Sequence, residues 1–410
     1  MSRTVEIKGR QLLVTADFNA TAFGLEVIGI PDGVDDLFLN GRQLEPSSNK
    51  IGAWSIPKVS GLPTSKPNLP DLKTLDWYTL DAIPEVSADF DVSAFPKADL
   101  EKTYNSYVSP QTPTSLFASD YGFNAGSLVY VGTVNATSGE TQLSIDTQGG
   151  TAFASATWFD GEFLGSFSAD QNTRHKADTF DLGKTLEAGS SHRIFTVVDH
   201  MGLEENYNPG DDTMKEPRGI LNWSLLTPDG PSQATATWHI TGNFGGEQYV
   251  DKARGPLNEG GLFVERQGYH LPNPPVDKLT KGSPLDGVTK AGLNFYTTNF
   301  TLDIPANHDV PISVVFDNSD KSLNYRAFIY VNGWQFGRYV NQLGPQNSFP
   351  VPEGILNHRG ENWLSVVVWA LGKDGVKVGI SLDSGVPVLS GMKAVELVDS
   401  PAWEARKGVY

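Results

Sequence analysis

A segment of more than forty residues occurs twice in this chain. Residues 156–202 begin with ATWFDGEFLGSF, and residues 328–372 begin with FIYVNGWQFGRY. The offset between equivalent residues is nearly constant, at 172, 169 and 170 for the pairs Gly161/Gly333, Phe180/Phe349 and Gly202/Gly372. Because the offset holds over so long a stretch, the sequence predicts two copies of one folded module.

Turn chemistry indicates that each copy is built from β-strands. Asp160-Gly161 and Asn332-Gly333 occupy equivalent positions, and Asn40-Gly41 repeats the pattern near the start of the chain. Such pairs favour two-residue hairpin turns, in which both positions need positive φ. A second glycine follows four residues later, at Gly165 and Gly337, and predicts a bulge or a close backbone approach.

Composition supports an all-β chain. The 410 residues include 42 glycines and 26 prolines, which suits many short strands joined by turns. No long stretch shows the 3.6-residue apolar period of a helix. Short strands at near-regular spacing are typical of antiparallel sandwiches of jelly-roll type, and the length leaves room for roughly three domains.

Proline-rich stretches suggest where those domains meet. Prolines punctuate the region after residue 56, and the run LPNPP spans residues 271–275. We therefore expect residues 1–70 to form most of a small β-sandwich with a linker, residues 71–271 a first jelly roll and residues 272–410 a second. The first region is short for an independent domain, so we expect it to be the end of something larger.

Charge and hydropathy exclude several classes of partner. The net charge of −17 argues against nucleic acid, which needs clustered Lys and Arg. The chain has no cysteine, which excludes disulfides, thiol catalysis and thiolate metal sites. No apolar run reaches the eighteen or so residues of a membrane span, and the first residues lack the apolar core of a signal peptide.

Four Asn-x-Ser/Thr sequons point to a secreted parent protein. They begin at Asn19, Asn135, Asn222 and Asn299. The alternative is chance, since the pattern arises easily in a chain rich in Asn, Ser and Thr. We interpret the sequons as candidate glycosylation sites.

The sequence shows no catalytic or metal site. The segment from Asp199 to Glu205 combines His200 with several carboxylates, but its counterpart in the second copy lacks them, and most acidic loops are solvated surface. The seven histidines are scattered without metal-ligand spacing. Asp211-Asp212 is a loop candidate for calcium, with a solvated loop as the favoured alternative. We predict no catalytic residue, metal ligand or cofactor.

Two equivalent tryptophans are candidates for sugar contact. Trp158 and Trp334 flank the hairpin turns of the two copies and could form platforms for a pyranose ring. The favoured alternative is that they fill sandwich cores, because buried aromatic residues dominate the packing of such folds.

Several longer strings resemble one enzyme family. They are SDYGF (119–123), IDTQGG (145–150), DHMGLEEN (199–206), PRGILN (217–222), RGPLNEGGL (254–262) and GPQNSFPVPEGILN (344–357). Together they resemble the C-terminal part of fungal β-galactosidases of glycoside hydrolase family 35, over essentially the whole chain. The resemblance implies two galactose-binding-like jelly rolls after most of a small third domain.

The resemblance also implies a function for a larger parent. Those enzymes are secreted glycoproteins that hydrolyse terminal β-D-galactosyl residues with retention, using two glutamates of a (β/α)₈ barrel. No residue of this chain matches the motifs that carry those glutamates, so we expect a non-catalytic β-domain region associated with a barrel in cis or in trans. The alternatives are a lectin-like module that binds galactosides and an accessory chain for a separate barrel.

Overall fold

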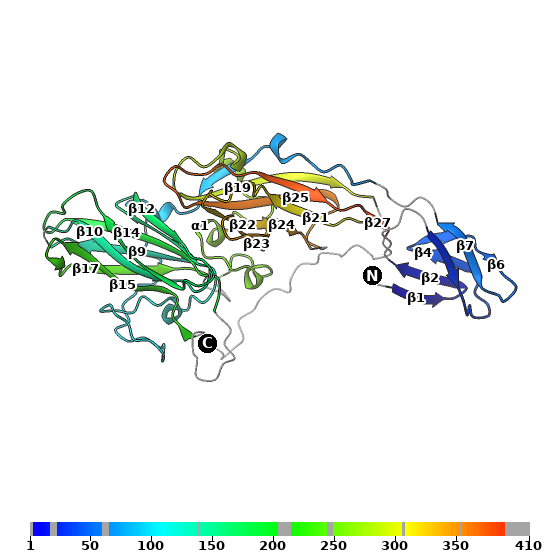
Figure 1. The fold of residues 1–410 in the computed structure, drawn as a ribbon, viewed down its shortest axis with the longest axis horizontal. Helices are drawn as coiled ribbons and strands as arrows, with labels where there is room; N and C mark the ends of the chain where they lie inside the picture. The colour runs from blue at the N-terminus through cyan, green and yellow to red at the C-terminus, as the bar shows by residue number, and fades with distance from the viewer. Residues whose placement is uncertain are drawn as a thin grey trace.

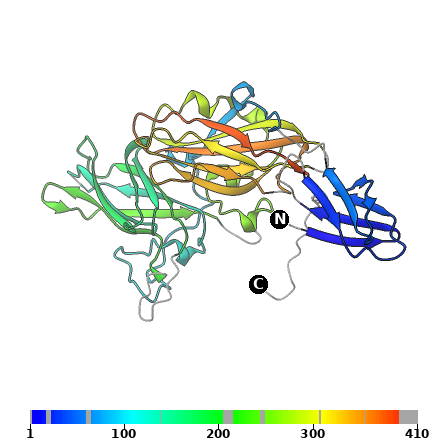
Figure 2. The ribbon, with the colours of Figure 1, turned by 45° about the vertical axis from the view of Figure 1, so that its right-hand side comes forward.

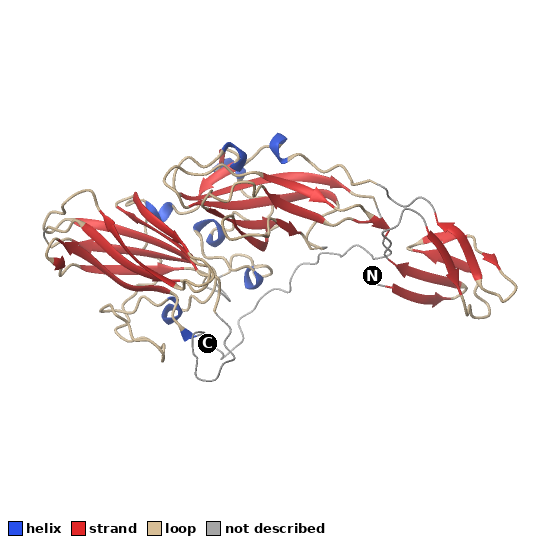
Figure 3. Ribbon diagram, in the orientation of Figure 1, coloured by secondary structure: helices blue, strands red, loops and turns tan. Residues whose placement is uncertain are grey.

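The computed structural model describes residues 3–16, 23–59, 65–137, 139–203, 215–243, 249–305, 308–352 and 354–389. This part of the chain is built of β-sheets with a few short helical turns, as Figure 3 shows. Three sandwiches lie in a row in Figures 1 and 2, with the last in sequence placed between the other two. The prediction of an all-β chain of sandwiches is confirmed.

The N-terminal sandwich is small. Its two sheets have the strand orders β1-β2-β4-β5 and β3-β7-β6. Leu37 and Leu39 lie at the centre of its core and are almost completely buried. The strands are β1 (Arg3–Lys8), β2 (Gln11–Ala16), β3 (Phe23–Val27), β4 (Asp36–Leu39), β5 (Arg42–Leu44), β6 (Ser47–Ser48) and β7 (Trp54–Val59).

The first large sandwich packs a five-stranded sheet, of order β12-β11-β14-β9-β17, against a four-stranded sheet, of order β13-β10-β15-β16. Alternate residues such as Leu143 and Ile145 point into the core between them, which is the pattern of a half-buried strand. The strands are β9 (Ser127–Asn135), β10 (Gln142–Gln148), β11 (Ala154–Phe159), β12 (Glu162–Ser168), β13 (His175–Asp181), β14 (Ser191–Asp199), β15 (Gly219–Thr227), β16 (Gly230–Pro231) and β17 (Thr235–Thr241).

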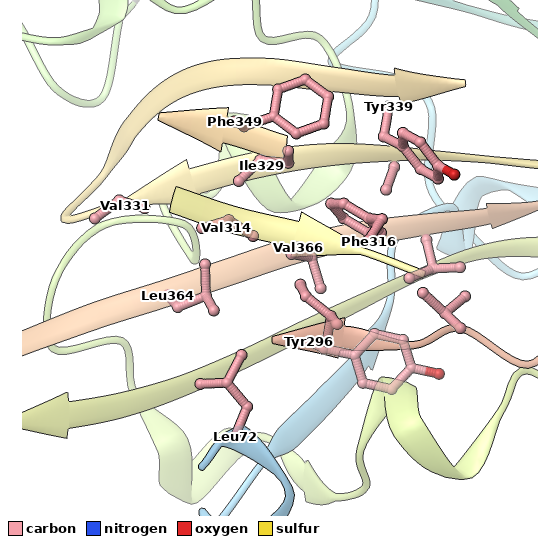
Figure 4. Packing of buried hydrophobic residues seen from close by; sticks show 14 of the residues in the cluster. Leu72, Tyr296, Val314, Phe316, Ile329, Val331, Tyr339, Phe349, Leu364 and Val366 are labelled. Carbon is pink, nitrogen blue, oxygen red and sulfur yellow. The ribbon is translucent and has the colours of Figure 1, made fainter. Parts of the chain in front are cut away.

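The second large sandwich packs a six-stranded sheet, of order β18-β8-β19-β25-β22-β23, against the sheet β24-β21-β26, with β20 and β27 paired separately. Phe316, Tyr339 and Phe349 pack against one another in its core (Figure 4). The strands are β8 (Tyr78–Asp81), β18 (Thr280–Lys281), β19 (Gly292–Asp303), β20 (His308–Asp309), β21 (Ile312–Phe316), β22 (Tyr325–Val331), β23 (Trp334–Val340), β24 (Ser348–Pro350), β25 (Arg359–Ala370), β26 (Ile380–Ser384) and β27 (Val388–Leu389).

The helical elements of the described residues are all short. The α-helix α1 spans Phe263–Arg266, and no described helix is long and apolar enough to cross a membrane. The 3-10 turns are η1 (Leu72–Thr74), η2 (Pro84–Val86), η3 (Ala118–Tyr121), η6 (Gly255–Leu257), η7 (Val276–Lys278) and η8 (Pro284–Asp286).

The two large sandwiches have matching strand orders. The series β12-β11-β14-β9-β17 corresponds to β23-β22-β25-β19-β8, and β13-β10-β15 corresponds to β24-β21-β26. The correspondence extends the repeated segment to both sheets of each sandwich. One strand differs in its origin, because β8 precedes the whole first sandwich in sequence yet pairs with β19 of the second. The predicted first module, residues 71–271, therefore contributes a strand to the second sandwich.

The three predicted hairpin turns are confirmed. Asp160 and Gly161 have φ values of 50° and 84°, and Asn332 and Gly333 have 48° and 81°. Asn40-Gly41 adopts the same conformation, with φ values of 49° and 78°. Left-handed backbone at both positions is the geometry that makes such a turn follow the twist of the flanking strands.

The second glycine of each copy lies beside a bulge, as predicted. Gly165 pairs with Thr157 where the β11–β12 register shifts, and Gly337 pairs with Ile329 where the β22–β23 register shifts. A Cβ atom at Gly165 would lie 2.5 Å from the Phe180 ring, and one at Gly337 would lie 2.6 Å from the Phe349 ring. The glycines therefore let an aromatic ring of the opposite sheet approach the backbone.

A third apolar cluster joins the two large sandwiches. In β9 and β14, alternate residues face the core of the first sandwich, while Val131 and Phe195 face outward. In β22 and β25, Tyr330 and Trp369 face outward in the same way. These outward side chains pack together, so each of the four strands is buried on both faces and reads as a nearly continuous apolar run.

Candidate functional site

A buried ion-pair network lies between the two large sandwiches. Asp199, the last residue of β14, accepts hydrogen bonds from Arg326 of β22 at 3.0 Å and from Arg338 of β23 at 2.8 Å. The side chains of Asp199 and Arg326 are 1% and 2% exposed. Arg326 also donates to the carbonyl oxygen of Phe153 at 2.9 Å. Asp199 thus fixes the orientation of one sandwich against the other.

Sequence reasoning placed Asp199 in an acidic cluster and missed both arginines. A signal was present, because Arg326 is a charged residue inside the apolar strand β22. A charge in a strand that is buried on both faces requires a partner. The partner of Arg326 is Asp199, which belongs to the other copy of the repeat, and a single sequence does not show which acidic residue lies opposite a given arginine.

A second buried polar group lies beside α1. Burial raises the pKa of Glu265 to about 7, against the lowering effect of a hydrogen bond donated by the Tyr330 hydroxyl. The other carboxyl oxygen of Glu265 accepts from the backbone N–H of Leu262 at 2.9 Å and caps the helix. Tyr330 belongs to β22, so Glu265 also connects the sandwiches.

A cavity of about 270 Å³ adjoins Glu265. Phe95 and Tyr249 supply aromatic surface to its lining, and His270 supplies a ring that contacts Tyr330 at 5.2 Å between centroids. Burial lowers the pKa of His270 to about 4, so this imidazole is neutral near pH 7. The charged side chains of the lining are Asp251, Glu265 and Arg266. Both carboxyl oxygens of Glu265 already accept hydrogen bonds, from Tyr330 and from Leu262, so this carboxyl is held in a structural role.

Ser190, His192 and Asp160 have the spacing of a catalytic triad. His192 lies 2.7 Å from the Ser190 hydroxyl through Nε2 and 2.7 Å from Asp160 through Nδ1. However, the Ser190 hydroxyl donates to the carbonyl oxygen of Glu187 at 2.6 Å. A nucleophilic serine would instead donate to the histidine, which acts as its base.

The second copy shows that this arrangement has a structural role, which is to hold the hairpin turn against a neighbouring strand. Asn332 and Asn362 occupy the positions of Asp160 and His192, and their side chains are joined by a 2.9 Å hydrogen bond. Asn332 Oδ1 accepts from the backbone N–H of Trp363 at 2.8 Å, just as Asp160 Oδ1 accepts from the N–H of Arg193 at 2.9 Å. Both pairs tie the hairpin turn to the next strand.

The two candidate sugar platforms lie in different surroundings. Trp158 is 4% exposed, and its ring contacts Phe163 and Phe195 edge-to-face in the cluster between the sandwiches. Trp334 is half-buried, and the Arg254 guanidinium lies 5.7 Å from the ring centroid. Trp158 thus occupies a core position, which is the alternative that the sequence favoured, while Trp334 is partly covered by a cation.

Family models match both the small and the large sandwiches. A model described as "Beta-galactosidase second all-beta domain" matches residues 90–204 and again residues 263–374, and one described as "Beta-galactosidase, domain 3" matches residues 1–55. The chain belongs to the family of β-galactosidase all-β domains. Because one model matches twice, the repeat in the sequence is a repeat of this family domain.

Relatives of these β-galactosidase domains align with the whole chain. "Beta-galactosidase A" of Aspergillus niger is 47% identical over 409 residues, and "Probable beta-galactosidase A" of Emericella nidulans is 48% identical over 412. Each match covers 100% of this chain, which spans only 40% of the relative. Among solved structures, a GH78 family rhamnosidase of Bacillus sp. GL1 is 14% identical over 65% of this chain and 33% of its own, with a TM-score of 0.24.

Three of the four sequons of this β-galactosidase domain region lie on its described surface. Asn135 is exposed at the end of β9, Asn222 is exposed in β15, and Asn299 is exposed in β19, where its amide donates to Glu361 at 2.8 Å. Asn19 lies outside the described residues. The exposed asparagines are accessible to a glycosyltransferase, and their modification stays a prediction.

The remaining acidic candidates, Glu204, Glu205, Asp211 and Asp212, lie outside the described residues. Elsewhere, the described part of the chain holds no group of three or more His, Cys, Asp or Glu side chains that could bind a metal ion.

Proposed function

We propose that this chain is the non-catalytic β-domain region of a secreted, glycosylated β-galactosidase of glycoside hydrolase family 35. The parent enzyme would hydrolyse terminal β-D-galactosyl residues with retention, on a (β/α)₈ barrel supplied in cis or in trans. The observation that carries the proposal is the match of two β-galactosidase domain models to all three sandwiches. The substrates of that parent enzyme would be β-galactosides.

The architecture supports a scaffolding role for this region. The two large sandwiches share a buried apolar interface with a buried ion-pair network, so they form one rigid unit rather than two independently moving modules. We propose that residues 71–271 and 272–410 are jelly rolls of the galactose-binding-like type, with β8 of the first segment added to the second sandwich. Residues 1–70 would be most of a small third domain and its linker.

The test is an activity assay on the purified 410-residue chain. We expect no hydrolysis of a chromogenic β-galactoside, because the barrel glutamates are outside this sequence. Turnover that scales with chain concentration and persists through further chromatography would overturn the non-catalytic assignment. The A. niger relative, assayed in parallel, shows that the conditions detect a β-galactosidase.

Association with a barrel is tested separately. The chain is mixed with a separately produced barrel from the same relative, and the mixture is run by size-exclusion chromatography. Co-elution supports the association, and independent elution at concentrations of about 10 µM argues against a stable complex in trans.

A further inference from the structure

The equivalent glycines of the two hairpin turns have different surroundings. A Cβ atom at Gly333 would lie 3.0 Å from Arg254 and 3.1 Å from Leu271, in the segment that follows the first large sandwich. At Gly161 no described atom beyond the chain neighbours lies within 4 Å of the same point. The turn of the second copy is therefore covered by another part of the chain, whereas the turn of the first copy is open.

One asparagine makes the polar contact that covers the second turn. Asn258, which is 6% exposed, donates through its side-chain amide to the Gly333 carbonyl oxygen at 2.8 Å. Its side-chain oxygen accepts from the backbone N–H of Gln335 at 2.9 Å. A single carboxamide thus satisfies a backbone acceptor in the turn and a backbone donor in the edge strand β23.

The first copy presents the same two backbone groups without such a partner. They are the Gly161 carbonyl oxygen and the Phe163 N–H, at a constant offset of 172 residues from those of the second copy. Phe163 lies opposite Trp158, one pair beyond the two-residue turn, where antiparallel residues do not bond each other. Because β12 is an edge strand, the Phe163 N–H points away from the other strands of the sheet. Within the described part of the chain, no side chain takes the place of the asparagine.

A cavity of about 620 Å³ lies beside these backbone groups and has the size of a ligand pocket. Trp158 and Phe163 of the first sandwich and Leu293 of the second line it, and all three belong to the apolar cluster that joins the sandwiches. The cavity therefore continues an existing interface. Its lining carries two positive and two negative side chains, whose formal charges cancel and favour an uncharged ligand. They are Lys290, Lys373, Asp81 and Glu162.

We propose that this cavity binds the side chain of an asparagine carried on a loop of a partner polypeptide. The carboxamide oxygen accepts from the Phe163 N–H, and the carboxamide N–H donates to the Gly161 carbonyl oxygen. These bonds repeat the contacts that Asn258 makes in the second copy. A carboxamide is uncharged and carries an acceptor and a donor side by side, which neither a carboxylate nor an aliphatic side chain does.

The experiment is an NMR titration of the ¹⁵N-labelled 410-residue chain with N-acetyl-asparagine N-methylamide, whose only primary carboxamide is the side chain. We expect the Phe163 amide resonance to shift saturably, with a Kd on the order of 1–10 mM for so small a probe. The matched aspartate probe lacks the donor and should bind at least tenfold more weakly. The matched leucine probe should leave the resonance unchanged.

Two variants separate the backbone donor from the aromatic ring. Phe163→Pro removes the N–H at an edge position that proline tolerates, and binding followed at the Glu162 amide should weaken at least tenfold. Phe163→Leu is the control, because it retains the N–H, and its Kd should stay within about threefold of wild type.

Three results would overturn the proposal. The first is no saturable shift of the Phe163 amide with the asparagine probe, and the second is an equal shift with the leucine probe. The third is a saturable shift with galactose alone, which would assign the cavity to a sugar. If Phe163→Pro fails to fold, as judged by the β14 amide resonances, the probe series on wild type decides alone.

Discussion

At the scale of single residues, the duplicated glycines show how a side chain can be excluded by the opposite sheet. Gly337 lies against Phe349, which is 6% exposed and has little room to move. Gly165 lies against Phe180, which is only half-buried and has more freedom. The same sequence position is therefore expected to tolerate a methyl group differently in the two copies.

We predict that Gly337→Ala destabilises the protein by about 1–3 kcal/mol, through overpacking against Phe349. Gly165→Ala should cost less, because Phe180 can shift toward solvent. Gly372→Ala is the control, since no atom lies within 4 Å of a Cβ there, and it should change stability by less than about 0.5 kcal/mol. Urea denaturation measures all three, and equal stability of the Gly337 and Gly372 variants would contradict the packing argument.

At the scale of elements, turns and repeats could be predicted from the sequence but partners could not. Asp160-Gly161 has a local conformational requirement, positive φ at both positions, so its role follows from residue type. Trp369 is different, because an apolar residue in a strand predicts burial without saying against which surface. Strand β8 is the extreme case, since its pairing with β19 joins segments more than 200 residues apart in sequence.

Strand β25 has one face in the core of its own sandwich and the other in the interface, so each surface can be tested by its own mutation. Val366 faces the core of its own sandwich and Val367 faces the other sandwich, and both are 0% exposed. We predict that Val366→Ala and Val367→Ala each cost about 2 kcal/mol, from two lost methyl contacts and the cavity left behind. Hydrogen exchange should distinguish them: β11 and β14 amides exchange faster in Val367→Ala only.

That comparison has a clear contrary result. If the β11 and β14 amides exchanged faster to the same extent in both variants, the two sandwiches would be unable to separate while their own cores stayed folded. Unchanged exchange in both would mean that the interface contributes little to the stability of the first sandwich.

At the scale of the whole molecule, the Asp199 network accounts for how two copies of one domain become a single unit. In the second copy, Trp369 occupies the position of Asp199. The equivalent strand ends therefore supply a charge from the first sandwich and an aromatic ring from the second. The ion pairs add a directional requirement, because Arg326 donates both to Asp199 and to the carbonyl oxygen of Phe153 in the other sandwich.

We predict that Asp199→Asn destabilises the protein by about 3–5 kcal/mol, because it leaves the buried Arg326 without a counter-charge, while Arg338 keeps its ion pair with Glu259. Asp383→Asn is the control: it removes the 2.8 Å pair with Lys66, whose partners are 54% and 61% exposed, and should cost less than about 1 kcal/mol. Calorimetry of wild type should show the two large sandwiches unfolding together, and Asp199→Asn should separate their transitions. If Asp199→Asn kept a single transition at the wild-type temperature, the apolar cluster alone would be sufficient to hold the sandwiches together.

The double variant Asp199→Leu with Arg326→Met should recover part of the loss, since it removes both buried charges and retains apolar volume.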